Sequence, residues 1–161
     1  MTLDGCFHPR FALRRMCCSI YIFEEKTLKG VNMELDIESL MYEEESYNIR
    51  GAIFEVYSIL GSGYLEEVYQ NALEEELGLR NIPFEAKKRI NIVYKGRNCG
   101  NYYSPDFICY DKIIVEIKAA ESIHEKHKAQ LMNYLKATGY KVGFLVNFGS
   151  YPKVSIYRVV N

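Results

Sequence analysis

Two carboxylates and a lysine stand within a strand-like stretch of the sequence, where charged side chains are costly to bury without partners. They are Asp106, Glu116 and Lys118, in the segment YYSPDFICYDKIIVEIKAAE at residues 102–121. Carboxylate oxygens are ligands that Mg²⁺ prefers, and waters and a substrate phosphate usually complete its shell. A neighbouring lysine can orient an attacking water or neutralise charge that develops on the phosphate. These residue types therefore suit metal-assisted hydrolysis of a phosphate ester.

The turn between the two strands decides where these side chains lie. Successive strand residues face opposite sides of a sheet, so Glu116 and Lys118 share one face. A three-residue turn at 110–112 places Asp106 directly opposite Glu116. A two-residue turn would move Asp106 to the apolar face, which burial disfavours. We therefore predict the three-residue register, with these apolar side chains on the other face: Phe107, Cys109, Ile113, Val115 and Ile117.

Residue types alone leave two interpretations of this arrangement open. Opposed carboxylates with Cβ atoms about 5 Å apart repel each other unless a positive group lies between them. A metal ion would supply that positive charge. The simpler alternative is a cross-strand Lys–Glu pair on a solvated face, which contributes well under about 1 kcal/mol.

Three helices and several strands are expected to position these residues. Apolar residues at three- and four-residue spacing predict one helix from Asp36 to Leu60 and a second from Leu65 to Gly78. A third fits Ser122–Thr138, with Ser122 as N-cap in a capping box. Three strand-like segments precede this helix, with a turn at YKGRN, and two strands follow at 141–148 and 153–160. The order α-α-β-β-β-α-β-β predicts a mixed sheet with helices packed on it.

Length and composition are those of one ordinary globular domain, with 161 residues, 48% of them hydrophobic and 25% charged. The five cysteines show no metal-ligand spacing, which favours a reducing cytoplasm over a disulfide scaffold. The apolar run at 16–23 is shorter than the roughly 20 residues of a membrane span, so no membrane partner is expected. No feature indicates a homo-oligomer.

The two ends of the chain differ in pattern and charge. Residues 1–32 show neither helical period nor strand alternation, so we expect a poorly ordered leader or N-terminal extension before a single domain at 33–161. Residues 1–76 carry 15 acidic and 6 basic side chains, net −9, and residues 77–161 carry 6 acidic and 14 basic, net +8. The basic half could face a polyanion, or it could simply form solvated strand edges and helix faces.

Three blocks of the sequence resemble a known family. The spacing PD, nine residues, EIK at 105–118 is similar to the signature of the PD-(D/E)XK nuclease superfamily. The segment GSGYLEEVY resembles the hallmark of its mostly prokaryotic GxxExxY branch, with Gly63, Glu66 and Tyr69 filling the pattern. The segment HKAQLMNYLKATGYKVGFLVNFG at 127–149 resembles the closing block of that branch.

The resemblance implies an α/β (α+β) fold with a restriction-endonuclease-like core, in the order α-β-β-β-α-β, whose mixed central sheet is flanked by helices. It implies that Asp106, Glu116 and Glu66 hold Mg²⁺ or Mn²⁺. It also implies that Lys118 completes the catalytic set. From the residues alone, Glu66 is equally an acid that favours the helix dipole, and Glu67 could serve as well.

The resemblance adds three supporting residues. Gln130 and Tyr134 are similar to the QxxxY pattern of related nucleases, and their spacing places both on one helical face. Tyr69 is the third. Core packing is the simpler role for both tyrosines.

The function expected from these residues is Mg²⁺-dependent hydrolysis of phosphodiester bonds in nucleic acid, with DNA as the expected substrate and metal-activated water as the nucleophile. The alternative is a non-catalytic nucleic-acid-binding module on the same fold. Metal-dependent cleavage distinguishes the two functions.

Overall fold

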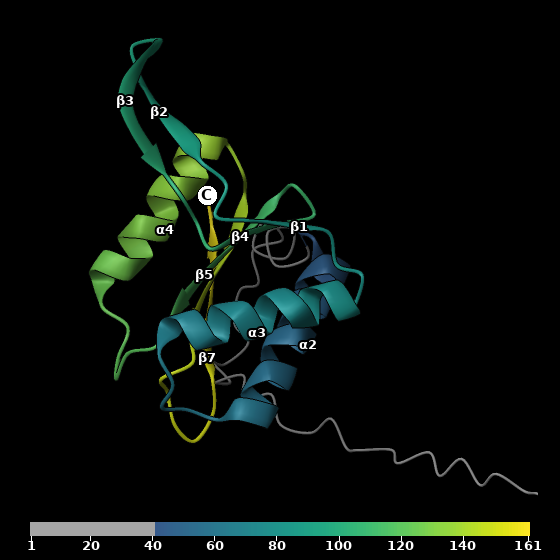
Figure 1. Cartoon of the computed structure of the whole chain (residues 1–161). Helices are drawn as coiled ribbons and strands as arrows, with labels where there is room; N and C mark the ends of the chain where they lie inside the picture. The colour runs from purple at the N-terminus through teal and green to yellow at the C-terminus, as the bar shows by residue number, and fades with distance from the viewer. Residues whose placement is uncertain (1–40) are drawn as a thin grey trace, which may run out of the picture. The chain divides into compact units, whose positions relative to one another are not determined.

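The computed structural model describes residues 41–161, which form a mixed arrangement of helices and strands (Figure 1). Predictions for residues 1–32, and for the first helix at 36–40, lie outside the described residues. None of the helices within 41–161 is long and apolar enough to cross a bilayer. In chain order the elements are α2 (Glu43–Leu60), α3 (Glu66–Leu79), β1 (Phe84–Ala86), β2 (Ile90–Tyr94), β3 (Arg97–Tyr103), β4 (Phe107–Cys109), β5 (Ile113–Lys118), α4 (Glu125–Thr138), β6 (Val142–Asn147) and β7 (Ser155–Val160).

Five strands form the main sheet in the order β1-β4-β5-β6-β7. Strands β5 and β6 are parallel and joined through α4, whereas the other neighbours are antiparallel. Between β1 and β4 the chain forms a separate hairpin, β2–β3, so five strands stand where the sequence predicted three. With this hairpin set apart, α3-β1-β4-β5-α4-β6 follows the predicted α-β-β-β-α-β order, and the predicted fold class is confirmed.

The predicted register of the β4–β5 hairpin is confirmed. Phe107 pairs with Val115 and Cys109 pairs with Ile113, which leaves the three-residue turn at 110–112. Tyr110 and Asp111 adopt φ values of 54° and 53°, the left-handed conformation that reverses the chain. Continuing the same register brings residue 106, just before β4, opposite residue 116.

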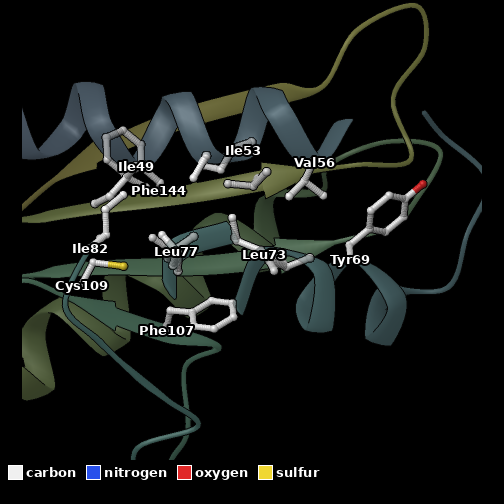
Figure 2. Close-up of a cluster of buried hydrophobic side chains, with 14 of the residues drawn as sticks. Ile49, Ile53, Val56, Tyr69, Leu73, Leu77, Ile82, Phe107, Cys109 and Phe144 are labelled. Carbon is white, nitrogen blue, oxygen red and sulfur yellow. The ribbon is translucent and has the colours of Figure 1, made fainter. Parts of the chain in front are cut away.

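The central strands are buried on both faces. On one face, side chains of α2 and α3 pack against inward residues of β4, β5 and β6, including Phe107, Cys109 and Phe144 (Figure 2). On the other face, Leu131 and Leu135 of α4 pack against residues of the same strands. The face of β5 that carries Glu116 is therefore covered by α4. The alternative of a charged pair on a solvated face is wrong.

Two helix starts differ from the prediction. Tyr42 has a left-handed φ of 57°, so α2 begins at Glu43. The predicted Ser122 cap is wrong, because α4 begins at Glu125 and its N-cap is His124 in an extended conformation. The side chain of Asn147 bonds both backbone groups of Ala120 and so fixes the segment that leaves β5. The predicted end at Gly139, where φ is 77°, is confirmed.

Candidate active site

Glu116 lies on β5 beneath α4, with 3% of its surface exposed. Its Oε1 accepts hydrogen bonds from Lys118 Nζ at 2.9 Å and from Gln130 Nε2 at 3.0 Å. Its Oε2 is also buried, yet it has no hydrogen-bond partner within residues 41–161. A buried carboxylate oxygen without a partner is costly unless a cation or a proton neutralises it.

The surroundings of Glu116 favour its neutral form. The pKa of Glu116 is raised to about 7, first by burial and then by the negative charge of Asp106, while Lys118 acts in the opposite direction. Two acidic groups held together in a dry site favour either a shared proton or a bound cation. Glu116 and Asp106 therefore form an electrostatically coupled pair, in which the negative charge of Asp106 disfavours ionisation of Glu116.

Asp106 is the second buried acid, also 3% exposed, and it lies where the chain enters β4. Its Oδ2 accepts a hydrogen bond from the backbone N–H of Ile117 at 2.7 Å, which ties the carboxylate to the neighbouring strand. Its Oδ1 forms an ion pair with Lys87. The orientation of Asp106 is thus fixed from two sides.

Lys118 links the buried acids to the first turn of α3. Its Nζ donates to the Ile117 carbonyl at 2.8 Å and lies 3.9 Å from Oε1 of Glu66. Burial, the largest single cause, lowers the pKa of Lys118, but the negative charges of Glu116, Glu66 and Asp106 together outweigh it, so the net shift of the pKa is upward. The amine therefore stays charged. Of the two adjacent glutamates, Glu66 is the one that contacts Lys118.

Gln130 and Tyr134 reach this cluster from α4. Besides its bond to Glu116, Gln130 Nε2 donates to the Tyr134 hydroxyl at 2.6 Å. The Tyr134 ring packs against Tyr103, at the end of β3, with ring centroids 5.0 Å apart. The expected helical face is thus turned toward Glu116.

Tyr69 lies in the core instead of the cluster. Its side chain is fully buried and stacks on Phe148, with centroids 4.5 Å apart. Its hydroxyl donates to the Gly61 carbonyl at 2.8 Å and accepts from the Tyr64 N–H at 3.2 Å. The role of Tyr69 in this structure is to hold the segment that leads into Glu66.

Sequence reasoning missed Lys87, which pairs with Asp106 from the segment after β1. A backbone bond of 3.0 Å from the Lys87 N–H to the Asp106 carbonyl brings the two residues together. Lys87 also has a φ of 51°, uncommon for a residue with a side chain. Its only signal in the sequence was the basic run KKR, which indicates a positive charge but does not say which acidic residue it pairs with.

The acidic side chains of this cluster could bind a metal ion through two carboxylates, but not through three. Across residues 41–161, no three His, Cys, Asp or Glu side chains lie close enough to hold a metal by themselves. Mg²⁺ needs fewer, since it is commonly bound through one or two carboxylates with waters and substrate phosphates. Asp106 and the unpartnered Oε2 of Glu116 match that requirement, while Glu66, with 46% of its side chain exposed, lies at the edge.

Comparisons with known proteins give one family and one solved structure. A family model described as PD-(D/E)XK nuclease superfamily matches residues 43–159. A solved structure described as "Crystal structure of SSO0001" is 24% identical, with a TM-score of 0.46, and the match covers 76% of this chain and 60% of that chain. The present chain thus matches less than two thirds of that protein. None of the curated proteins matches the chain.

Proposed function

The chain belongs to the PD-(D/E)XK nuclease superfamily, and from this premise we propose that it is a divalent-metal-dependent nuclease that hydrolyses phosphodiester bonds, with DNA as the expected substrate. The observation that supports the proposal is the buried pair of Asp106 and Glu116: Oε2 of Glu116 has no partner in the described residues, while its Oε1 accepts from the charged Lys118. Membership of the GxxExxY branch is part of the proposal and is supported by Gly63, Glu66 and Tyr69.

Asp106 and Glu116 would hold Mg²⁺ or Mn²⁺ directly, and Glu66, at the edge of the cluster beside Lys118, would take part through a water of the metal ion. The bound cation would supply Lewis-acid polarisation of the scissile phosphate and a more acidic water. The Ile117 N–H keeps Asp106 oriented, and Gln130 keeps Oε1 of Glu116 in place, so Oε2 stays available.

Lys118 would act on the phosphate. Its ammonium is positioned by Glu116 and Ile117 before any substrate arrives. Such a fixed charge can stabilise negative charge that develops on the phosphoryl oxygens or orient the attacking water. Because Glu66 is partly exposed next to Lys118, it borders the side from which a substrate can approach.

The test replaces one carboxylate while keeping its shape. Asp106→Asn keeps an oxygen that can accept from the Ile117 N–H but removes the charge, so we expect cleavage to fall about a hundredfold or more. Asp111→Asn, in the exposed turn of the same hairpin, is the matched control and should cleave normally. The assay follows end-labelled duplex DNA, single-stranded DNA and RNA with Mg²⁺, Mn²⁺ or EDTA.

Two outcomes would reject the proposal. Cleavage that persists in both Asp106→Asn and Lys118→Met would remove these residues from the chemistry. A wild-type protein that binds these nucleic acids but cleaves none of them, with either metal, would favour the non-catalytic binding module.

A further inference from the structure

The hairpin β2–β3 is the least buried part of the described fold. It forms a two-stranded sheet of its own and extends away from the main sheet (Figure 1). Every residue of β3 from Arg97 to Tyr102 is exposed. Val93, Tyr94 and Tyr102 are large apolar side chains that are at least half exposed. Only Ile90 and Tyr103, at the base of the hairpin, pack against a core cluster, so the exposed side chains toward its tip have no role in packing.

The hairpin carries charge of one sign. Residues 87–103 hold five basic side chains and no acidic one. Among the ion pairs formed within residues 41–161, none involves Arg89, Lys95 or Arg97. Unneutralised cations on an exposed ribbon fit a polyanion.

The base of the hairpin is connected directly to the candidate active site. Lys87, before β2, pairs with Asp106, and the Ser104 hydroxyl, after β3, donates to the Lys87 carbonyl at 2.9 Å. Tyr103, the last residue of β3, packs on Tyr134 beside Gln130. A ligand that follows the hairpin toward its base therefore arrives at the buried acids.

We infer that the β2–β3 hairpin is an arm that binds the backbone of a nucleic-acid duplex and leads it to the site; this inference rests on the proposed function. A two-stranded ribbon is an element that the major groove of a duplex admits. The seven residues of β3, at about 3.3 Å each, reach along a large part of one helical turn.

The exposed tyrosines favour phosphate contacts over stacking on unpaired bases. Arg89 lies over the Tyr102 ring at 4.6 Å, and Lys95 lies over the Tyr94 ring at 5.5 Å. Each ring therefore has a cation over one face, which limits the position of that cation on the hairpin. Fixed cations on a ribbon suit the regularly spaced phosphates of a duplex.

The test measures binding without cleavage. The full chain in EDTA is titrated into a labelled duplex or a single strand of the same sequence, at several salt concentrations, and fluorescence anisotropy is recorded. In the double variant Lys95→Gln and Arg97→Gln, we expect duplex affinity to fall about tenfold and the salt slope to decrease by about two. The charge-matched control is Lys141→Gln with Lys153→Gln, which are exposed and lie outside the hairpin; it should bind like wild type.

Three results would overturn the inference. They are equal losses in the two double variants, a loss confined to the single strand, and a loss explained by a changed oligomeric state in size-exclusion chromatography. The nuclease proposal is tested separately by cleavage in Mg²⁺. If the wild type cleaves DNA and the hairpin variant binds as tightly as wild type, only this inference is rejected. If binding depends on the hairpin but the wild type cleaves nothing, only the nuclease proposal is rejected.

Discussion

The two oxygens of the Glu116 carboxylate have opposite surroundings. Oε1 accepts from Lys118 and Gln130, whereas Oε2 is buried without a partner in the described part of the chain. In the metal-free protein a proton is the simplest neutralising partner for this group, in accord with its raised pKa. Oε2 is therefore the atom at which a proton, or the metal ion of the proposal, would supply the missing positive charge.

This gives a prediction for stability against pH. The pKa of Glu116 is about 7 in the folded protein and about 4.5 when the group is exposed. Between these values the folded state binds more protons than the unfolded state, so the free energy of unfolding falls as pH rises through this window. In EDTA, wild type should lose stability relative to Glu116→Gln between about pH 5 and about pH 8, as measured by urea denaturation.

Two comparisons check the origin of this loss. Glu121→Gln removes an exposed acid and should follow the pH dependence of wild type. A constant difference in stability between wild type and Glu116→Gln across the pH range would contradict the assignment.

Lys87 gives a second prediction, for metal affinity. Its ammonium pairs with Oδ1 of Asp106. Asp106 would need this same oxygen to bind a metal ion. A divalent cation must compete with this lysine, so Lys87→Met should bind Mn²⁺ several times more tightly by isothermal titration calorimetry. Lys88→Met, the adjacent lysine that pairs with Glu85, is the control and should leave the affinity unchanged. Weaker Mn²⁺ binding in Lys87→Met would mean that the lysine supports the site instead.

At the scale of elements, the site depends on how the ends of β5 and β6 are held. Asn147, opposite Lys118, is buried and bonds Ala120 through both its amide nitrogen and its oxygen. Its oxygen also accepts from the Gly149 N–H at 3.1 Å. These hydrogen bonds hold the backbone that follows β5 in place, directly after Lys118, the lysine of the proposed active site.

Gly149 tests the role of these hydrogen bonds. A Cβ at residue 149 would lie 2.5 Å from the Ala120 carbonyl oxygen and 2.7 Å from its nitrogen, both backbone atoms. Gly149→Ala should therefore cost about 1–3 kcal/mol of stability and lower the cleavage rate by displacing the end of β5. Gly78→Ala, where nothing lies within 4 Å inside α3, should be neutral or stabilise by up to about 1 kcal/mol. Chemical denaturation of both variants measures the difference, and equal stabilities would refute the argument.

The sequence predicted the elements best where a local pattern determines them. The β4–β5 register follows from alternation and turn length, and the structure confirms it. The Ser122 cap was wrong because the sequence offers two capping candidates close together, and the structure uses the later one: His124 is the N-cap and shares a capping box with His127. The separation of β2–β3 from the main sheet was missed because alternation does not say which strand pairs with which.

At the scale of the molecule, the fold class and the opposed acids were accessible from the sequence because the core strands carry near-continuous apolar runs interrupted by charges. The burial of the charged face was not accessible, because it depends on α4 covering the sheet. The contact between Lys87 and Asp106 was not accessible either, since it depends on how the hairpin closes at its base.

The charged side chains at and around the proposed site come from two kinds of structure. Glu116 comes from a strand covered on both faces, and amide hydrogens in such a strand exchange with solvent only when much of the fold opens. Lys87 and Glu66 come from a loop segment and a partly exposed helix turn, where local opening costs far less. Amide hydrogen exchange should therefore be slow in the strand that carries Glu116 and faster in the segments that carry Lys87 and Glu66.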